Sequence, residues 1–423
     1  MPTRHLIGLL LGVEEDWPGA FEGLVRRAGL RIRHRGETHE LATERITIEP
    51  FNLRARPRYS LVIDRLGWWY DLPREWLKKV ALMDGVYLLN NPFTFQAMEK
   101  HTAYCAMIRL GLEVPETWIV PHKQPPAENP RFSGMAARYM QLFDLDEVAA
   151  RVGYPLYMKP FDGGAWVGVT RVAGPAELHR AYDDSGRRLM HLQASIENYE
   201  VFVRSLSVGA ETMVMRYDPS RPLHDRYSVS HGFLDADAGS QAVTVSRLVN
   251  AFFRWELNSC EMLVRDGHVH PIDYANASPD LAITSLHYYF PWAIRALLRW
   301  CAFCLVTGRR MRVDQDTTRY FAVADRSELD QYQKLAAYRR MADAYFEMER
   351  YQSFCARHLA HLDEVVVGFF RGPELDRVLV DTVRDTFPAH EHEGFIAHYR
   401  GLIAQWCAEQ DASPSATRSP APV

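Results

Sequence analysis

A lysine followed by a glycine-rich stretch is the feature of this sequence best suited to bind phosphate. The segment YPLYMKPFDGGAWVGVTRV (154–172) places Lys159 at the end of an apolar run of strand length, followed by Gly163, Gly164 and Gly168. Glycine lets backbone N–H groups approach phosphate oxygens closely, and a lysine adds a mobile positive charge. No Gly-Lys-Ser/Thr follows, so this is not a Walker A motif, and an ordinary hairpin around the glycines is the alternative.

A strand that ends in Lys-Pro before a glycine-rich loop is typical of the ATP-grasp superfamily, which the chain resembles over roughly residues 86–290. The segment NNPFTFQAMEKHTAYCAMIRLGLEVPETWIV (90–120) is similar to the part that opens the family's nucleotide-binding region, and Lys100 matches its first nucleotide-contacting lysine. Only six of the 49 basic residues are lysines, and two of them fall at the family's two lysine positions. The resemblance implies that Lys100 and Lys159 bind the phosphates of ATP, and a solvated helix lysine is the alternative for Lys100.

The segment HLQASIENYE (191–200) resembles the family's hinge, which holds adenine between two lobes. The resemblance implies that Gln193 and Ile196 contact the base, with Ile196 forming an apolar wall. Glu200 follows Gln193 at the spacing of the ribose-binding acid in D-alanine–D-alanine ligases. A carboxylate can accept hydrogen bonds from both ribose hydroxyls, and an exposed surface glutamate is the alternative.

The segment CEMLVRDGHVHPIDYANASPD (260–280) resembles the family's closing hairpin, in which two acids and an asparagine hold Mg²⁺ against ATP. The implied metal ligands are Glu261, Asp273 and Asn276, and the implied cofactors are ATP and Mg²⁺. Hard oxygen ligands suit Mg²⁺, which takes few protein carboxylates and leaves positions for phosphates and water. A polar hairpin with exposed acids is the alternative, and Glu256 is the next candidate if Glu261 is not a ligand.

The spacing of these acids sets a condition on the hairpin. Side chains alternate along a strand, so Asp273 and Asn276 would face opposite sides unless a bulge or turn lies between them. A two-residue turn at Asp266-Gly267 would pair Glu261 with Ile272, whereas a three-residue loop or a bulge would pair Glu261 with Asp273. The resemblance therefore predicts an odd-length loop or a bulged hairpin.

Arginines are expected to complete the site, because phosphoryl transfer concentrates negative charge. Arg204 matches an arginine of the glutamate-adding ligases, and Arg216 is the next candidate for a phosphate or a substrate carboxylate. The chain contains 43 arginines, so a structural role is the alternative for each.

The resemblance implies that an α+β ATP-grasp fold positions these residues. Hydrophobic periodicity predicts alternating strands and helices in the first 120 residues, and hence a small parallel sheet. We expect one continuous helix over 92–111, another around 136–152, and helices from Pro291 onwards. The predicted parts are an N-terminal βα (pre-ATP-grasp) domain over 1–121, ATP-grasp lobes over 122–290, a helical C-terminal region over 291–410 and a disordered tail over 411–423.

Composition favours a globular protein. The 423 residues are 47% hydrophobic and 24% charged, with a formal net charge of −4, which gives no electrostatic reason to expect a nucleic-acid or anionic-membrane partner. The apolar stretch 6–13 is too short to span a membrane, and we expect no other stretch of transmembrane length and a cytoplasmic location. The six cysteines are scattered, with no disulfide or zinc pattern.

The resemblance implies an ATP-dependent ligase: ATP phosphorylates a small-molecule carboxylate, and an amine attacks the acyl phosphate to form an amide. A phosphotransferase on the same fold is one alternative. A non-catalytic nucleotide-binding regulatory protein is another, suggested by the irregular spacing of Asp273 and Asn276. The helical last third matches nothing in the resemblance, and it is a candidate substrate-binding, lid or homo-oligomer element.

Overall fold

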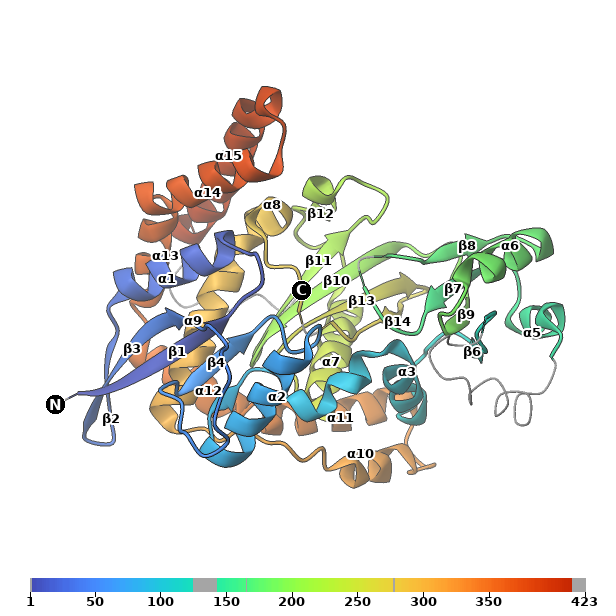
Figure 1. The fold of residues 1–423 in the computed structure, drawn as a ribbon, viewed down its shortest axis with the longest axis horizontal. Helices are drawn as coiled ribbons and strands as arrows, with labels where there is room; N and C mark the ends of the chain where they lie inside the picture. The colour runs from blue at the N-terminus through green and yellow to red at the C-terminus, as the bar shows by residue number, and fades with distance from the viewer. Residues whose placement is uncertain (1, 125–142, 165, 277, 413–423) are drawn as a thin grey trace.

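The computed structural model describes residues 2–124, 143–164, 166–276 and 278–412, and its strands form three sheets. Figure 1 shows an N-terminal sheet at one end, a large antiparallel sheet in the middle and a small antiparallel sheet at the other end. The elements that follow the large sheet, between residues 283 and 412, are all helices. The predicted α+β class, with a βα unit first and a helical region last, is confirmed, and two antiparallel sheets after a βα unit are the arrangement that the ATP-grasp resemblance implies.

The N-terminal sheet has the strand order β2-β3-β1-β4-β5, with β1, β3, β4 and β5 parallel and β2 antiparallel at one edge. Its strands are β1 (Thr3–Leu10), β2 (Arg31–His34), β3 (Glu37–Arg45), β4 (Leu61–Asp64) and β5 (Tyr87–Leu88), and its helices are α1 (Asp16–Ala28), α2 (Asp71–Lys79) and the π-helical turn η1 (Val80–Asp84). The parallel sheet was predicted. The β2–β3 hairpin was not, because its residues are largely charged and polar and show no apolar alternation.

The helix expected over 92–111 is broken at Glu99. Residues Pro92–Met98 form the 3₁₀ segment η2, and α3 (Lys100–Arg109) starts afresh after Glu99, whose ψ is 120°. The Lys100 N–H donates to the carbonyl of Phe161 at 2.8 Å instead of to a helical carbonyl. This tertiary hydrogen bond places Lys100 at the first turn of α3, next to the glycine-rich loop.

The small sheet has the order β6-β9-β7-β8 and is antiparallel throughout. Its elements are β6 (Thr117–Val120), α5 (Leu145–Val152), β7 (Leu156–Pro160), β8 (Thr170–Val172), α6 (Pro175–Ser185) and β9 (Met190–Ala194). The apolar residues of this part, such as Leu156, Leu178 and Leu192, form a core of their own. Of the helix predicted around 136–152, the part before residue 143 lies outside the described residues.

The large sheet has the order β12-β11-β10-β13-β14 and is also antiparallel. Its elements are β10 (Val201–Val208), β11 (Glu211–Tyr217), η3 (Leu223–Asp225), β12 (Tyr227–Ser228), α7 (Ala236–Phe253), β13 (Leu257–Arg265) and β14 (His268–Asp273). One face packs on α7 through residues such as Val203 and Met262. On the opposite face, Leu206 and Val208 pack on later helices. The rest of that face is left open to a cavity.

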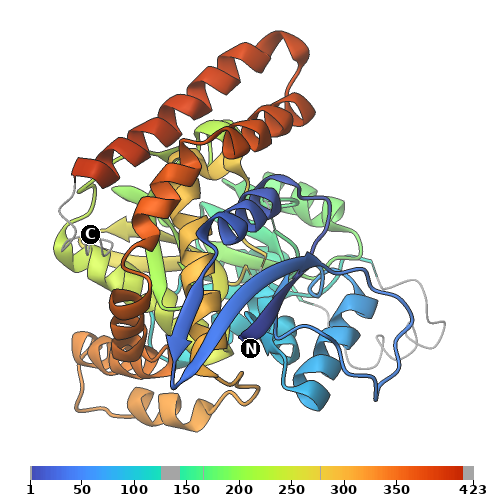
Figure 2. The ribbon, with the colours of Figure 1, turned by 90° about the vertical axis from the view of Figure 1, so that its left-hand side faces the viewer.

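The C-terminal third is helical, as predicted. Its elements are α8 (Ile283–Leu286), η4 (His287–Tyr289), α9 (Phe290–Thr307), α10 (Thr317–Ala324), α11 (Gln331–Tyr345), α12 (Met348–His358), α13 (Leu362–Phe370), α14 (Pro373–Thr386), η5 (Ala389–Glu391) and α15 (His392–Ala412). Figures 1 and 2 both show α14 and α15 projecting at one end of the molecule. Homo-oligomer formation through these helices stays a prediction, and positions 413–423 of the predicted tail lie outside the described residues.

One segment has the length of a membrane span, contrary to expectation. Within Ile283–Thr307, a window of 18 residues has a mean hydropathy of 1.3, and all of that window is buried inside the protein. The segment contains α9, which packs against β10 and the C-terminal helices. Its apolar composition is therefore explained by its position in the core.

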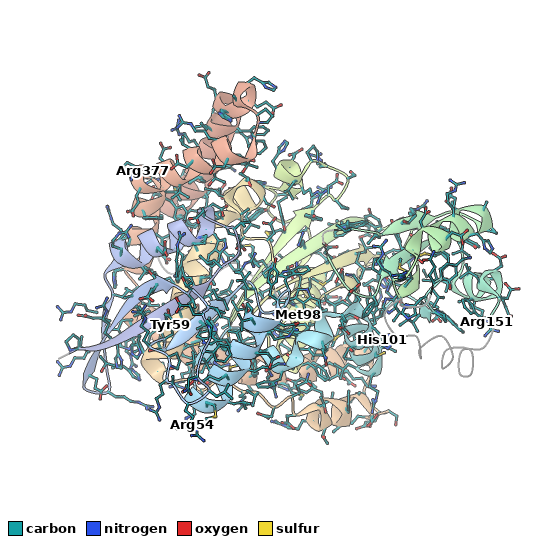
Figure 3. All side chains as sticks on the ribbon, in the orientation of Figure 1. Arg54, Tyr59, Met98, His101, Arg151 and Arg377 are labelled. Atoms are coloured by element: carbon teal, nitrogen blue, oxygen red, sulfur yellow. The ribbon has the colours of Figure 1, made fainter. Side chains whose placement is uncertain are left out.

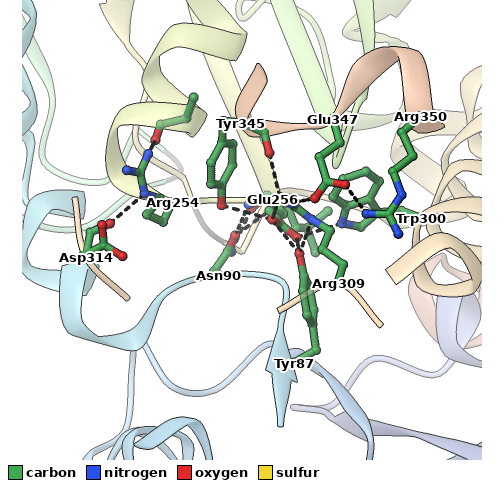
Figure 4. A network of polar contacts seen from close by, with 12 residues as sticks. Tyr87, Asn90, Arg254, Glu256, Trp300, Arg309, Asp314, Tyr345, Glu347 and Arg350 are labelled. Carbon is green, nitrogen blue, oxygen red and sulfur yellow. Dashed lines mark hydrogen bonds and ion pairs between the residues drawn. The ribbon is translucent and has the colours of Figure 1, made fainter. Parts of the chain in front are cut away.

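A buried carboxylate joins three parts of the molecule (Figure 4). Glu256, just before β13, accepts hydrogen bonds from Tyr87 of the N-terminal sheet and from Trp300 of α9 at 2.7 and 2.8 Å. It also accepts from the Arg309 guanidinium and from the Tyr345 hydroxyl, each at 3.0 Å. The Glu256–Arg309 pair leaves 4% of each side chain exposed. Both carboxylate oxygens of Glu256 are therefore engaged in structure, which removes it as an alternative metal ligand.

We predict that Glu256→Gln destabilises the fold by about 3 kcal/mol, the scale of breaking a buried ion pair by removing one partner. The amide would present an N–H to donors and leave Arg309 with less compensation. The exposed pair Arg400–Asp376, with 52% and 44% of the side chains exposed, supplies the control, since Asp376→Asn should cost under about 1 kcal/mol. Urea denaturation measures both, and equal midpoints for the two variants would contradict the prediction.

Candidate active site

A cavity of about 780 Å³ lies between the open face of the large sheet, the small sheet and a loop of the N-terminal part. This volume is in the range of small-molecule sites. Met98, which lines the cavity, lies near the middle of the molecule in Figure 3, between Tyr59 of the N-terminal part and Arg151 of α5. Of the thirteen predicted site residues, ten line this cavity, and they are Lys100, Lys159, Gly163, Gly164, Gln193, Ile196, Arg204, Glu261, Asp273 and Asn276.

Three charged residues form a row across the large sheet. Arg204 on β10 lies opposite Glu261 on β13, which in turn lies opposite Asp273 on β14. The Arg204 Nη1 atom is 3.7 Å from Glu261 Oε1. Residues directly opposite each other in an antiparallel pair project from the same face, so all three side chains point into the cavity.

A bulge in the β13–β14 hairpin brings the two acids to one face. The turn has only two residues, Asp266 and Gly267, both with positive φ, from which regular pairing would set Glu261 opposite Ile272. The register shifts next to Pro271 instead, so that Asp273 pairs with Glu261. Proline has no N–H to donate to the ladder, which suits it to a bulge. Of the two expected solutions, the bulged hairpin is therefore the one found.

Asn276 reaches the same cavity wall. Its carbonyl accepts a hydrogen bond from the Ser259 N–H at 3.3 Å, and its own N–H donates to the Asn258 side chain at 2.7 Å. Ser259 and Glu261 are two residues apart on β13, whereas Asn276 and Asp273 are three apart. One extra residue is therefore accommodated between Asp273 and Asn276, as expected if both are to face the cavity.

The two lysines enter the cavity beside the glycine-rich loop. Lys100 Nζ donates to the Gly163 carbonyl at 2.8 Å and lies 3.4 Å from Asp273 Oδ2. Lys159 Nζ, from the end of β7, donates to Gln193 Oε1 at 2.6 Å. Both lysines are buried, which is unusual for this residue type. Both side chains also line the cavity, where a bound anion could contact them.

Burial and like charges perturb the ionisation of these groups. Desolvation, reinforced by the nearby Lys100 ammonium, lowers the pKa of Lys159 to about 8, although Asp273 and Glu261 oppose the shift. Burial also raises the pKa of Glu261, against the opposing effect of Arg204. Cations and carboxylates thus share one poorly solvated space, an arrangement common at sites that bind or transform charged ligands.

The glycine-rich loop needs its glycines for two different reasons. Gly163 has φ 85°, and its carbonyl contacts Lys100. Gly168, with φ 75°, does not line the cavity, and a Cβ there would lie 2.4 Å from Arg188 Nη1. The positive φ favours glycine at position 168, and contact of Gly168 with a ligand stays a prediction, while Ala165 lies outside the described residues.

The hinge residues are only partly as expected. Gln193 and Ile196 line the cavity, and the Gln193 amide donates to Thr117 Oγ1 at 2.8 Å. Glu200 does not line it, because its carboxylate accepts the Asp266 N–H at the hairpin turn, at 2.9 Å. The acid that the hinge presents to the cavity is Glu197, whose pKa is lowered by a hydrogen bond from Ser195.

One of the two predicted arginines, Arg216, points away from the cavity. Arg216 pairs with Val203 on the face of the large sheet opposite to the cavity, and its side chain is exposed. Its neighbour Tyr217 faces the cavity instead, and the Tyr217 hydroxyl accepts hydrogen bonds from Arg204 Nη1 at 3.2 Å and from Arg226 Nη1 at 3.5 Å. Arg226 therefore lines the cavity together with Arg204 and Arg171, and the sequence did not single it out among so many arginines.

A further part of the wall was not predicted. The loop after β4 contributes Trp68 and Trp69, and the segment after the hairpin contributes Asp280. The only visible signal was the pair of adjacent tryptophans in GWWYD (67–71), which follows a short apolar strand. In sheets with parallel strands, loops at the carboxyl ends of strands commonly form binding sites.

The donor set on the large sheet fits Mg²⁺. Glu261 and Asp273 supply carboxylate oxygens and Asn276 an amide oxygen on one wall, and Mg²⁺ is commonly held by one or two carboxylates together with phosphates and water. Within the described ranges, no group of three or more His, Cys, Asp or Glu side chains is placed to hold a metal.

Comparison with known proteins gives distant likenesses. No family model matches the chain. A D-alanine–D-alanine ligase from Heliobacterium modesticaldum is 33% identical over 98 residues, which amount to 22% of this chain and 26% of that enzyme. The chain thus matches only a minor part of the length of this relative.

Among solved structures, a D-alanine–D-alanine ligase from Bacillus anthracis complexed with ATP is 13% identical with a TM-score of 0.46, over 84% of this chain and 99% of that chain. A RimK-domain ATP-grasp protein from Sphaerobacter thermophilus is 12% identical with a TM-score of 0.45, over 65% of this chain and 92% of that chain. A RiPP-associated ATP-grasp ligase from Chryseobacterium gregarium, in complex with ADP and a leader and core peptide, is 10% identical with a TM-score of 0.44, over 73% and 98%. Identities and TM-scores this low do not establish a function. The function must therefore be inferred from the residues of the site.

Proposed function

We propose that this chain is an ATP-grasp enzyme that uses Mg-ATP to join a carboxylate to an amine through an acyl phosphate. The observation that carries the proposal is the convergence of Lys100, Lys159, Glu261 and Asp273 on one cavity, each at the position that the ATP-grasp resemblance implies. A general polar surface would not bury two lysines beside two carboxylates.

The nucleotide would lie between the small and the large sheet. Ile196 would offer an apolar surface to adenine, and Glu197, which lines the same cavity, would accept the ribose hydroxyls in the role that the resemblance implies for Glu200. Lys100 and Lys159 would bind phosphate oxygens below the glycine-rich loop. A polyphosphate is the ligand that best compensates two buried ammonium groups.

Glu261, Asp273 and Asn276 are the residues that would hold Mg²⁺. When bound, the ion would neutralise phosphate charge and orient the transferred group. Arg204, 3.7 Å from Glu261, would face the reacting carboxylate and balance the charge that develops during transfer.

The reaction conserves atoms and charge in two steps. A carboxylate oxygen of the substrate attacks the γ-phosphorus, the bond to the β–γ bridging oxygen breaks, and ADP leaves. The amine nitrogen then attacks the acyl carbon and loses a proton, and inorganic phosphate leaves as the amide forms. The residues of the cavity supply positioning and charge neutralisation and form no covalent bond with either substrate.

Binding of Mg-ATP is the first expected outcome. At a nucleotide concentration one hundred times the Kd, mass action stabilises the folded state by about 2.7 kcal/mol, which raises the melting temperature by a few degrees. Differential scanning fluorimetry with and without Mg-ATP measures the shift. If millimolar Mg-ATP does not change the melting temperature of the pure folded protein, the assignment of a nucleotide site is wrong.

The chemistry is tested by ATP turnover with pooled carboxylates and hydroxylamine as the amine. A hydroxamate marks an acyl phosphate and supports the ligase. A phosphorylated hydroxyl compound would mark a phosphotransferase, and tight Mg-ATP binding without any turnover would mark a regulatory protein.

Nucleotide affinity should depend on the charge of Lys159. Because the pKa of Lys159 in the free protein is lowered to about 8, its ammonium is present below that pH and lost above it. Phosphate contact raises that pKa again, so the Kd for Mg-ATP should increase as the pH rises from 7 to 9. Lys159→Ala should bind more weakly at pH 7 and show a flatter profile, measured by titration calorimetry. A wild-type Kd that is constant up to pH 9 would contradict the assignment.

The two acids of the hairpin should act together. Asp273→Asn and Glu261→Gln should each raise the Mg²⁺ concentration needed for ATP turnover at least about tenfold, since even outer partners of metal ligands act on this scale. The double variant should lose little more than either single one, because groups that hold one ion are non-additive.

Glu200→Gln is the matched control. It removes a carboxylate from the same sheet, but the amide oxygen can still accept the Asp266 N–H outside the cavity. The Mg²⁺ dependence of this variant should equal that of the wild type. A Glu261→Gln variant that behaved like Glu200→Gln would exclude Glu261 from the metal site.

A further inference from the structure

We propose that Trp68 and Trp69 form a specificity wall for the carboxylate substrate, which carries an aromatic or bulky apolar group next to its acid group. This inference rests on the proposed function and extends it to the class of substrate. Both tryptophans line the cavity from the N-terminal part, on a loop that none of the nucleotide or metal assignments uses.

The loop that carries the tryptophans is held in a fixed shape. Asp64, the last residue of β4, accepts the N–H groups of Leu66 and Gly67, both at 2.9 Å. The carbonyls of Gly67 and Trp68 accept hydrogen bonds from Arg74 at 3.4 and 3.3 Å. The two indoles are therefore presented by a preorganised turn, which reduces the entropy lost when a ligand binds.

Close packing against neighbouring helices also fixes the position of this loop. A Cβ on Gly67 would lie 2.5 Å from Leu77 Cδ1 and 2.9 Å from Phe95 Cε2, so the backbone rests directly on α2 and η2. Arg65 connects the loop to the segment on the other side of the cavity, because its Nη1 donates a hydrogen bond to the Pro279 carbonyl at 2.7 Å. The tryptophans are thus positioned relative to the segment that follows the metal-binding hairpin.

Some of the large apolar side chains that remain exposed line this cavity. Trp69 leaves 56% of its surface exposed, and Tyr199 and Leu223 on the other walls leave 43% and 55% exposed. Large apolar side chains that remain exposed around a hollow commonly mark a binding site, because a ligand would remove them from water. Indole rings also offer flat faces for stacking on an aromatic group.

Charge defines the other half of the substrate. Arg204 and Arg226 converge on the Tyr217 hydroxyl, and all three line the same cavity as the tryptophans. Two guanidinium groups favour a carboxylate, and an apolar group beside that carboxylate would contact the indoles. A small hydrophilic acid would leave the tryptophan wall in water, so the wall favours a substrate with an apolar group.

The test compares two acids that differ only in that group, 3-phenylpropionate and propionate. Titration calorimetry of the full chain with Mg-ADP present should give a Kd at least about tenfold lower for the aryl acid, the scale on which apolar pockets discriminate. Trp69→Ala should abolish most of this preference, and Trp68→Ala supplies a second variant. Tyr70→Ala is the matched control, because Tyr70 is 60% exposed and adjacent to Trp69 but does not line the cavity.

The outcomes separate this inference from the proposed function. Equal affinity for the two acids, no detectable binding of either, or an equal loss in Tyr70→Ala would overturn it, even where the Mg-ATP shift persists. A weaker Mg-ATP shift in Trp69→Ala with an unchanged preference between the acids would also overturn it, because the indole would then serve the nucleotide. A protein that shows no Mg-ATP shift but retains the aryl preference would lose the proposed function and keep the apolar subsite.

Discussion

The buried carboxylate of Glu256 is the interaction on which the geometry of this protein depends. It accepts hydrogen bonds from Tyr87, Trp300 and Tyr345, which come from the N-terminal sheet, α9 and α11. The backbone N–H of Glu256 donates in turn to the Asn90 side chain at 2.8 Å. Because β13 begins directly after Glu256, these bonds fix the start of the strand that carries Glu261. A buried charge that requires several donors at once allows few alternative arrangements of the elements that supply them.

Part of the site could be predicted from the sequence because some roles depend only on the local segment. Lys159 lies at the end of a strand before glycines, and Glu261 and Asp273 lie on the two strands of one hairpin, so the resemblance of these short segments to the ATP-grasp superfamily was enough to predict them as site residues. The bulge that brings Glu261 and Asp273 to one face was left open. The roles of Glu200 and Arg216 depend on side-chain direction. Strand pairing turns Arg216 away from the cavity, and the hairpin turn takes the Glu200 carboxylate, and neither fact is local.

The fold shows the same division. The α+β order and the helical last third follow from periodicity, which is set by the buried faces of the elements. The break at Glu99 does not follow from periodicity. It depends on a hydrogen bond from the Lys100 N–H to the carbonyl of Phe161, which is distant in the sequence. The tryptophan loop was missed for a similar reason, since its place at the cavity depends on the packing of Gly67 against Leu77 and Phe95, which are not its neighbours in the sequence.

The charged groups of the site are paired with other side chains in a way that ligand binding must change. Lys100 lies 3.4 Å from Asp273, and Lys159 donates to Gln193, so both ammonium groups have partners before any phosphate arrives. Under the proposed function, a cation on Glu261 and Asp273 would compensate these carboxylates and release Lys100 towards phosphate. The phosphates of the nucleotide would in turn compensate the positive charges of Lys100, Lys159 and Arg204. Metal and nucleotide would therefore each favour the binding of the other, because each removes a charge imbalance that the other creates in a space with little water.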